Sequence, residues 1–148
     1  MNPQKEYELI RVNENLRQQV IELLQENNLP VSDLGEGKHL FALLQNGKVV
    51  GTGGLELFSN CALLRSISVK KDLQNRGLGK YINKELERVS KEKGIDCLYL
   101  LTTTAKDFFC HEGYEVVDRE EAPESIKNTS EFSSVCPSTA VAMRKYLS

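Results

Sequence analysis

The sequence predicts a mixed α/β fold (α+β mixed sheet), on three observations. Alternating apolar segments follow one another over residues 39–44, 48–57 and 61–69, and Asn46-Gly47 between the first two is a strong hairpin turn. From Gly77 onward the apolar period changes to that of an amphipathic helix. A short apolar strand over 96–101 follows that helix and completes a βαβ unit. In such sheets ligands bind beyond strand ends where neighbouring strands diverge.

The other segments add elements at both ends of this sheet. A strand at its start precedes a helix with apolar residues at helical spacing, and residues 31–38 have the composition of a loop. Glycines close two of the helices. The further expected elements are a strand over 7–12, a helix from about 16 to 27, a short helix over 105–112, a strand over 114–117, a helical turn within 121–127 and a terminal strand over 139–146.

Composition limits the classes of function. The 148 residues, 40% of them hydrophobic, suit one domain spanning 1–148. The 19 Lys plus Arg against 21 Asp plus Glu give a net charge of −2, which favours neither nucleic acid nor an anionic membrane as partner. The chain has neither a long apolar run nor a recognisable leader, so we expect a cytoplasmic protein. Four scattered cysteines and two histidines predict reduced thiols and no metal site.

A loop over residues 70–80 joins an apolar strand to the longest helix. Free backbone N–H groups, the positive end of the helix dipole and the glycines Gly77 and Gly79 together form a cradle for phosphate. Arg76 and Lys80 add positive charge. The P-loop pattern fails at Gln74 and Tyr81, and the dinucleotide pattern fails at Ile82, which makes ATP and NAD poor ligands.

The pattern Gln74-x-x-Gly77-x-Gly79 resembles the pyrophosphate-binding signature of the GNAT (GCN5-related) N-acetyltransferase superfamily. The order of elements over nearly the whole chain is also similar to that family. The resemblance implies a GNAT acyl-CoA N-acyltransferase fold: a mostly antiparallel sheet with a central splayed parallel pair, flanked by helices, and acetyl-CoA as acyl donor. It implies that pantetheine pairs with the backbone of Ile67, Ser68 and Val69, and that pyrophosphate binds amides of Gln74, Asn75, Arg76, Gly77, Leu78, Gly79 and Lys80.

Two narrower resemblances concern the acceptor. Residues 100–105 with Phe108-Phe109, Gly113-Tyr114 and Cys136-Pro137 resemble the arsenic-resistance N-acetyltransferase-like subgroup. The same Leu-Thr-Thr stretch is similar to the acetyltransferase domains of N-acetylglutamate synthases. Both imply a small amino-acid-like amine as acceptor. Residues 119–137 are unusually many for a connection in so small a domain and combine charged and hydroxyl side chains, so we expect this segment to form a wall of the acceptor site. A homodimer is left open.

Glu56 and Arg65 are the candidate catalytic residues. The acceptor amine must lose a proton, and Glu56 lies on the strand next to the cofactor strand. Arg65 lies in an apolar run and should pair with Glu56 or with a substrate carboxylate. The alternatives are an exposed strand carboxylate at Glu56 and a purely structural ion pair at Arg65.

The family's usual tyrosine is replaced by Phe109, so the leaving thiolate lacks its usual proton donor. Cys110, Cys136 or water could replace that donor. Three functions follow: direct acetyl transfer to a small amine, a non-catalytic acyl-CoA-binding regulatory module, and a peptide or protein N-acetyltransferase.

Overall fold

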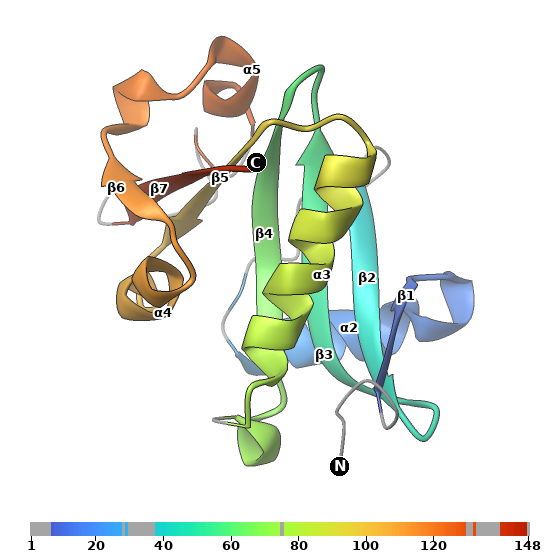
Figure 1. Cartoon of the computed structure of the whole chain (residues 1–148). Helices are drawn as coiled ribbons and strands as arrows, with labels where there is room; N and C mark the ends of the chain where they lie inside the picture. Colours follow the sequence, from blue (N-terminus) through green and yellow to red (C-terminus); the bar gives the residue numbers. More distant parts are fainter. Residues whose placement is uncertain are drawn as a thin grey trace.

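The computed structural model describes residues 7–27, 29, 38–74, 76–129, 132 and 140–147. These form one sheet with helices on its faces (Figure 1). The elements are β1 (Tyr7–Arg11), α2 (Glu14–Glu26), β2 (Lys38–Gln45), β3 (Lys48–Leu57), β4 (Cys61–Val69), the 3-10 helix η1 (Lys71–Leu73), α3 (Leu78–Glu92), β5 (Cys97–Thr102), α4 (Lys106–His111), β6 (Glu115–Val117), the 3-10 helix η2 (Arg119–Glu121), α5 (Glu124–Lys127) and β7 (Val141–Tyr146).

The sheet has the strand order β1-β2-β3-β4-β5-β7-β6, and among its described pairs only β4 and β5 run parallel. The parallel pair is short: it extends from Cys61 opposite Cys97 to Leu63 opposite Tyr99, after which the two strands diverge (Figure 1). This arrangement confirms the predicted mixed α/β fold with a central splayed parallel pair.

A β-bulge lies in β4 where the divergence begins. Thr52 of β3 pairs with Ser68, whereas Gly54 pairs with Arg65, so β4 contains one extra residue. Ser66 within the bulge has a φ of 60°, and its carbonyl oxygen accepts a hydrogen bond of 2.7 Å from the Thr52 hydroxyl. A bulge bends its strand and increases the local twist. The last residues of β4 therefore no longer run alongside β5.

Helices pack on both faces of the sheet. Ile82 and Leu86 of α3 lie in one core cluster with Leu55, Leu64 and Phe109. Gly53 makes this contact close, because a Cβ there would lie 2.6 Å from Leu86 Cδ1. On the opposite face α2 packs Val20, Leu23 and Leu24 against β2 and β3, and the segment containing α5 covers β5 (Figure 1).

The predicted elements agree with the structure to within a few residues. Asn13 caps α2, since its side-chain oxygen accepts a hydrogen bond of 3.1 Å from the Leu16 N–H. The helical turn predicted within 121–127 is α5, and the 3-10 helix η2 precedes it. Residues 31–37 of the predicted loop, and the start of the terminal strand at Thr139, lie outside the described residues.

Candidate active site

The diverging strands open a cavity of about 630 Å³ between β4, α3 and α4. This volume lies in the range of ligand-binding cavities. The described residues that line it are Asn27, Leu29, Ile67, Ser68, Val69, Leu73, Gln74, Gly77, Leu78, Gly79, Lys80, Thr104, Ala105, Phe108 and Phe109. The structure thus brings most of the predicted cofactor-binding residues together. Arg76 is exposed and does not line the cavity, and Asn75 lies outside the described residues.

The end of β4 presents a strand edge to this cavity. The Lys70 N–H donates a hydrogen bond of 2.9 Å to the Val50 carbonyl oxygen, so the polar backbone groups of Lys70 point toward β3. Alternation along the strand turns those of Val69 and Ile67 the other way, toward the gap. In the described part of the chain, β4 has no strand partner on that side beyond Leu63. An extended amide-bearing chain could pair with this edge.

The start of α3 forms the second wall. Gly77 is its N-cap with a φ of 83°, and this glycine has no side chain to cap the helix start. A Cβ on Gly77 would meet nothing within 4 Å, whereas one on Gly79 would lie 3.6 Å from the Phe108 ring. The residues of the first turn line the cavity at the positive end of the helix dipole. This is the geometry that binds phosphate groups.

Two side-chain amides hold the junction between the strand edge and the cradle. Gln74 Nε2 donates a hydrogen bond of 2.9 Å to the Val69 carbonyl oxygen, and Asn27 Nδ2 donates to the same oxygen at 3.1 Å. The side chain of Gln74 is thus used to shape the loop. Sequence reasoning missed Asn27, because an asparagine after an amphipathic stretch indicates only the end of a helix.

Glu56 and Arg65 form a buried ion pair. Arg65 Nη1 lies 3.0 Å from Glu56 Oε2, and the side chains are 1% (Arg65) and 9% (Glu56) exposed. The predicted pairing of the two residues is confirmed, and the alternative of an exposed carboxylate at Glu56 is wrong. Neither side chain lines the cavity. Arg65 Nε also donates to Ser66 Oγ at 3.4 Å, which places the pair directly beside the bulge.

Aromatic rings of α4 form the third wall. Phe108 and Phe109 contact each other edge to face at 4.9 Å between centroids, and Phe109 contacts Tyr114 in the same way at 5.4 Å. Tyr114 is buried behind Phe109 and does not line the cavity. Burial, and secondarily the negative charge of Glu87, raise the pKa of Tyr114. Its hydroxyl therefore does not replace the missing tyrosine at position 109.

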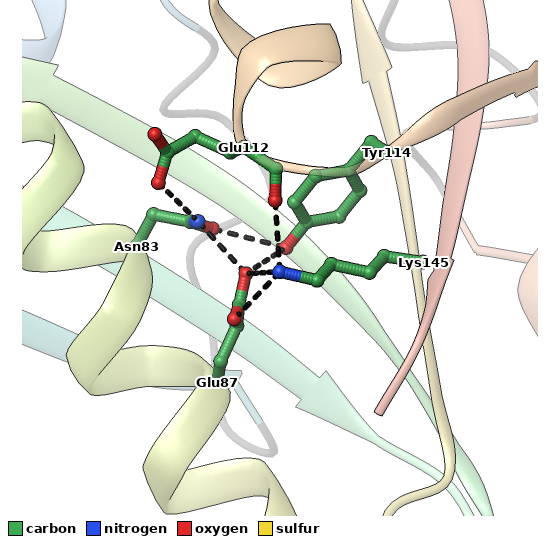
Figure 2. Close-up of polar contacts among 5 residues, drawn as sticks. All are labelled: Asn83, Glu87, Glu112, Tyr114 and Lys145. Carbon is green, nitrogen blue, oxygen red and sulfur yellow. Dashed lines mark hydrogen bonds and ion pairs between the residues drawn. The ribbon is translucent and has the colours of Figure 1, made fainter. Parts of the chain in front are cut away.

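A polar network behind Tyr114 fixes α4 to the rest of the fold (Figure 2). The Tyr114 hydroxyl donates a hydrogen bond to Asn83 Oδ1 at 2.9 Å, and Asn83 Nδ2 donates to Glu87 at 2.8 Å and to Glu112 at 3.3 Å. Lys145 Nζ donates to Glu87 Oε1 at 3.0 Å and to the Glu112 carbonyl at 2.8 Å. The sequence pattern around Tyr114 gave no indication of this network.

Other chemistry finds little support among the described residues. Cys61 and Cys97 are buried, and burial raises the pKa of the Cys97 thiol; Cys110 is exposed but does not line the cavity, and Cys136 is not described. No group of three or more His, Cys, Asp or Glu side chains in the described ranges is close enough to hold a metal ion. Within these ranges, every helix is too short or too polar to cross a bilayer.

The split sheet, free strand edge and uncapped helix start define the fold class of the acyl-CoA N-acyltransferases. A model of the acetyltransferase (GNAT) family matches residues 5–115, and the chain belongs to this family. The family predicted from the sequence is confirmed.

Similar proteins agree with this assignment. The chain is 27% identical over 90 residues to an uncharacterized N-acetyltransferase of Chlorobaculum tepidum; the match covers 60% of this chain and 57% of that protein's length. A GNAT-family acetyltransferase from Staphylococcus aureus superposes with a TM-score of 0.75 at 23% identity, covering 96% of this chain and 99% of that one. N-acetylglutamate synthase from Neisseria gonorrhoeae, complexed with coenzyme A and N-acetyl-glutamate, gives a TM-score of 0.81 at 17% identity, covering 96% and 35%.

Proposed function

We propose that this chain is an N-acetyltransferase that transfers acetyl from acetyl-CoA directly to the amine of a small, amino-acid-like acceptor. The observation that carries the proposal is the cavity between β4, α3 and α4, which combines a free strand edge with an uncapped helix start. The first suits the amides of pantetheine, and the second suits pyrophosphate. Membership of the acetyltransferase (GNAT) family supports the same donor.

In the proposed reaction the amine nitrogen attacks the thioester carbonyl carbon, the C–S bond breaks and the CoA thiolate leaves with a proton. A backbone N–H at the gap-facing edge of Ile67 or Val69 would stabilise the developing oxyanion, an effect of about 3 kcal/mol for one well-placed donor. Glu56 would take the amine proton through a bridging water, because its carboxylate does not reach the cavity wall. Arg65 would fix the orientation of that carboxylate.

The donor site is tested by Gly77→Glu with Gly94→Glu as its matched control. Both glycines have a φ of 83° and open space at the Cβ, so both substitutions impose the same backbone cost. Gly77→Glu places a negative charge in the cradle, whereas Gly94→Glu places it at the other end of α3. We expect calorimetry to show at least a tenfold loss of CoA affinity in Gly77→Glu alone. Equal affinities in the two variants would reject the cradle.

The base is tested by Glu56→Gln, with Glu115→Gln as control because Glu115 also pairs with an arginine, Arg144, at 2.7 Å but is exposed. We expect Glu56→Gln to lower turnover much more than CoA affinity, most strongly near neutral pH where the amine is mainly protonated. Wild-type kinetics in Glu56→Gln would leave the buried pair with a structural role only.

The acceptor class rests on the sequence resemblances and on the fold shared with N-acetylglutamate synthase. Thiol release from acetyl-CoA should be measured with amino acids, their arsenical analogues and short peptides, with a control lacking any acceptor. Turnover with a small amino acid would support the proposal, and turnover confined to peptides would favour a protein N-acetyltransferase. CoA binding without turnover would favour a regulatory module. The arsenic-related subgroup, the single domain over 1–148, the cytoplasmic location and a homodimer remain predictions.

A further inference from the structure

We propose that Asn27 is a positioning residue that couples the end of α2 to the donor-binding edge of β4. The inference rests on the proposed acetyl-CoA site. Asn27 follows the last residue of α2 and lines the cavity. Its side-chain amide donates one hydrogen bond to Ser68 Oγ and a second, of 3.1 Å, to the Val69 carbonyl oxygen. Both N–H groups of this amide are therefore directed at the last two residues of β4.

The Val69 carbonyl is the point where the strand edge ends and the phosphate cradle begins. Its oxygen accepts from Asn27 on one side and from Gln74 Nε2, at 2.9 Å, on the other. Two donors occupy both acceptor positions of a carbonyl oxygen and fix the plane of the following peptide. That plane sets the direction in which the chain leaves β4 for η1 and the start of α3. Asn27 thus helps to fix the distance between the free edge of β4 and the start of α3.

The backbone of Asn27 is bonded to its own helix, α2, which packs on the other face of the sheet. Val20, Leu23 and Leu24 of α2 are buried there, and the Asn27 N–H donates to the Leu23 carbonyl at 3.1 Å. The chain beyond α2 returns to the cavity, because Leu29 also lines it. Asn27 therefore connects the segment that borders the cavity from the α2 side with the strand that would hold the donor.

The physical chemistry of the contact identifies informative substitutions. The backbone of Asn27 has a φ of −96°, so alanine fits without strain and removes only the amide. Aspartate keeps the shape but puts carboxylate oxygens against the Val69 carbonyl and the Ser68 hydroxyl. Ser68→Ala removes one of the two acceptors. Gln25→Ala is the matched control, since it removes an exposed side-chain amide from the same helix.

The experiment measures CoA affinity by calorimetry and, for active variants, kcat and the KM of each substrate. Two hydrogen bonds of ordinary strength set an upper limit of about thirtyfold on the loss of CoA affinity in Asn27→Ala, and we expect a larger loss in Asn27→Asp than in Asn27→Ala. Steady-state kinetics should show a raised KM for acetyl-CoA with a smaller change in kcat. Asn27→Ala and Ser68→Ala should be less than additive in the double variant.

CoA affinity within twofold of wild type in Asn27→Ala and Asn27→Asp would overturn the inference while leaving the proposed function intact. Failure of the wild-type protein to bind CoA would instead overturn the proposed function. A purely structural role predicts a lower melting temperature with unchanged affinity for the folded fraction. That result would also contradict a positioning role. The Gln25→Ala variant shows how much the melting temperature and the CoA affinity change when a side-chain amide without these contacts is removed.

Discussion

Replacing Tyr114 by phenylalanine removes one hydroxyl from the network in Figure 2 and changes little else. The ring is buried against Phe109, so phenylalanine keeps the packing and creates no large cavity. The lost hydroxyl donates a 2.9 Å hydrogen bond to Asn83 Oδ1 and lies 3.3 Å from Glu87 Oε2. Asn83 is fully buried, which excludes water as a simple replacement partner.

The cost follows from that burial. A lost hydrogen bond that leaves a buried acceptor unsatisfied costs about 1–3 kcal/mol. Against a typical free energy of unfolding of about 5–15 kcal/mol this is a large fraction. In a chain of this size it corresponds to a decrease in the melting temperature of about 3–10 °C.

Urea denaturation of wild type and Tyr114→Phe gives the free energy directly, with Tyr146→Phe as control. Tyr146 is 65% exposed, so its hydroxyl should contribute less than about 0.5 kcal/mol. A change below that same limit in Tyr114→Phe would refute the reasoning, because it would mean that Asn83 finds another donor. In an absorbance titration of the wild-type protein, Tyr114 should ionise at a higher pH than an exposed tyrosine, since its pKa is raised.

Three further predictions concern single positions. Gly53→Ala should destabilise the fold by about 1–3 kcal/mol in denaturant titrations, because its Cβ would lie 2.6 Å from Leu86 Cδ1. Burial, and then the charge of Arg11, lower the pKa of His39 below 6.5, so the stability of the folded state decreases as the pH drops through 6.5. Between pH 7.5 and 5 the melting temperature should therefore depend less on pH in His39→Gln than in wild type. Phe109→Tyr adds a hydroxyl to the cavity wall and should raise kcat for thiol release, with CoA affinity unchanged.

Local sequence signals predicted the elements that depend on local chemistry. The Asn46-Gly47 turn, the change to helical period at Gly77 and the glycines after α3 and α4 all act over a few neighbouring residues, and each expected element is present. The glycine-containing start of α3, which lines the cavity, was predictable for the same reason, since it needs only glycines between a strand and a helix.

Contacts between distant segments were harder to predict. Asn27 reaches the end of β4 only because α2 crosses the opposite face of the sheet, and no periodicity encodes that crossing. The hydroxyl of Tyr114 bonds to Asn83 and Glu87 of α3, and Lys145 of β7 lies over its ring, so the sequence neighbours of Tyr114 give no sign of these partners. The Glu56–Arg65 pair was predictable because an arginine inside an apolar strand requires a partner.

The short contact between β4 and β5 also bears on how the protein resists unfolding. Three described residue pairs join the two parts of the sheet, so few backbone hydrogen bonds connect β1–β4 with β5–β7. A donor molecule lying along the free edge would act as an additional strand between them. At a concentration one hundred times its Kd, such a ligand adds about 2.7 kcal/mol to the stability of the folded state. The supply of acetyl-CoA would then affect how long the protein resists proteolysis as well as how fast it catalyses acetyl transfer.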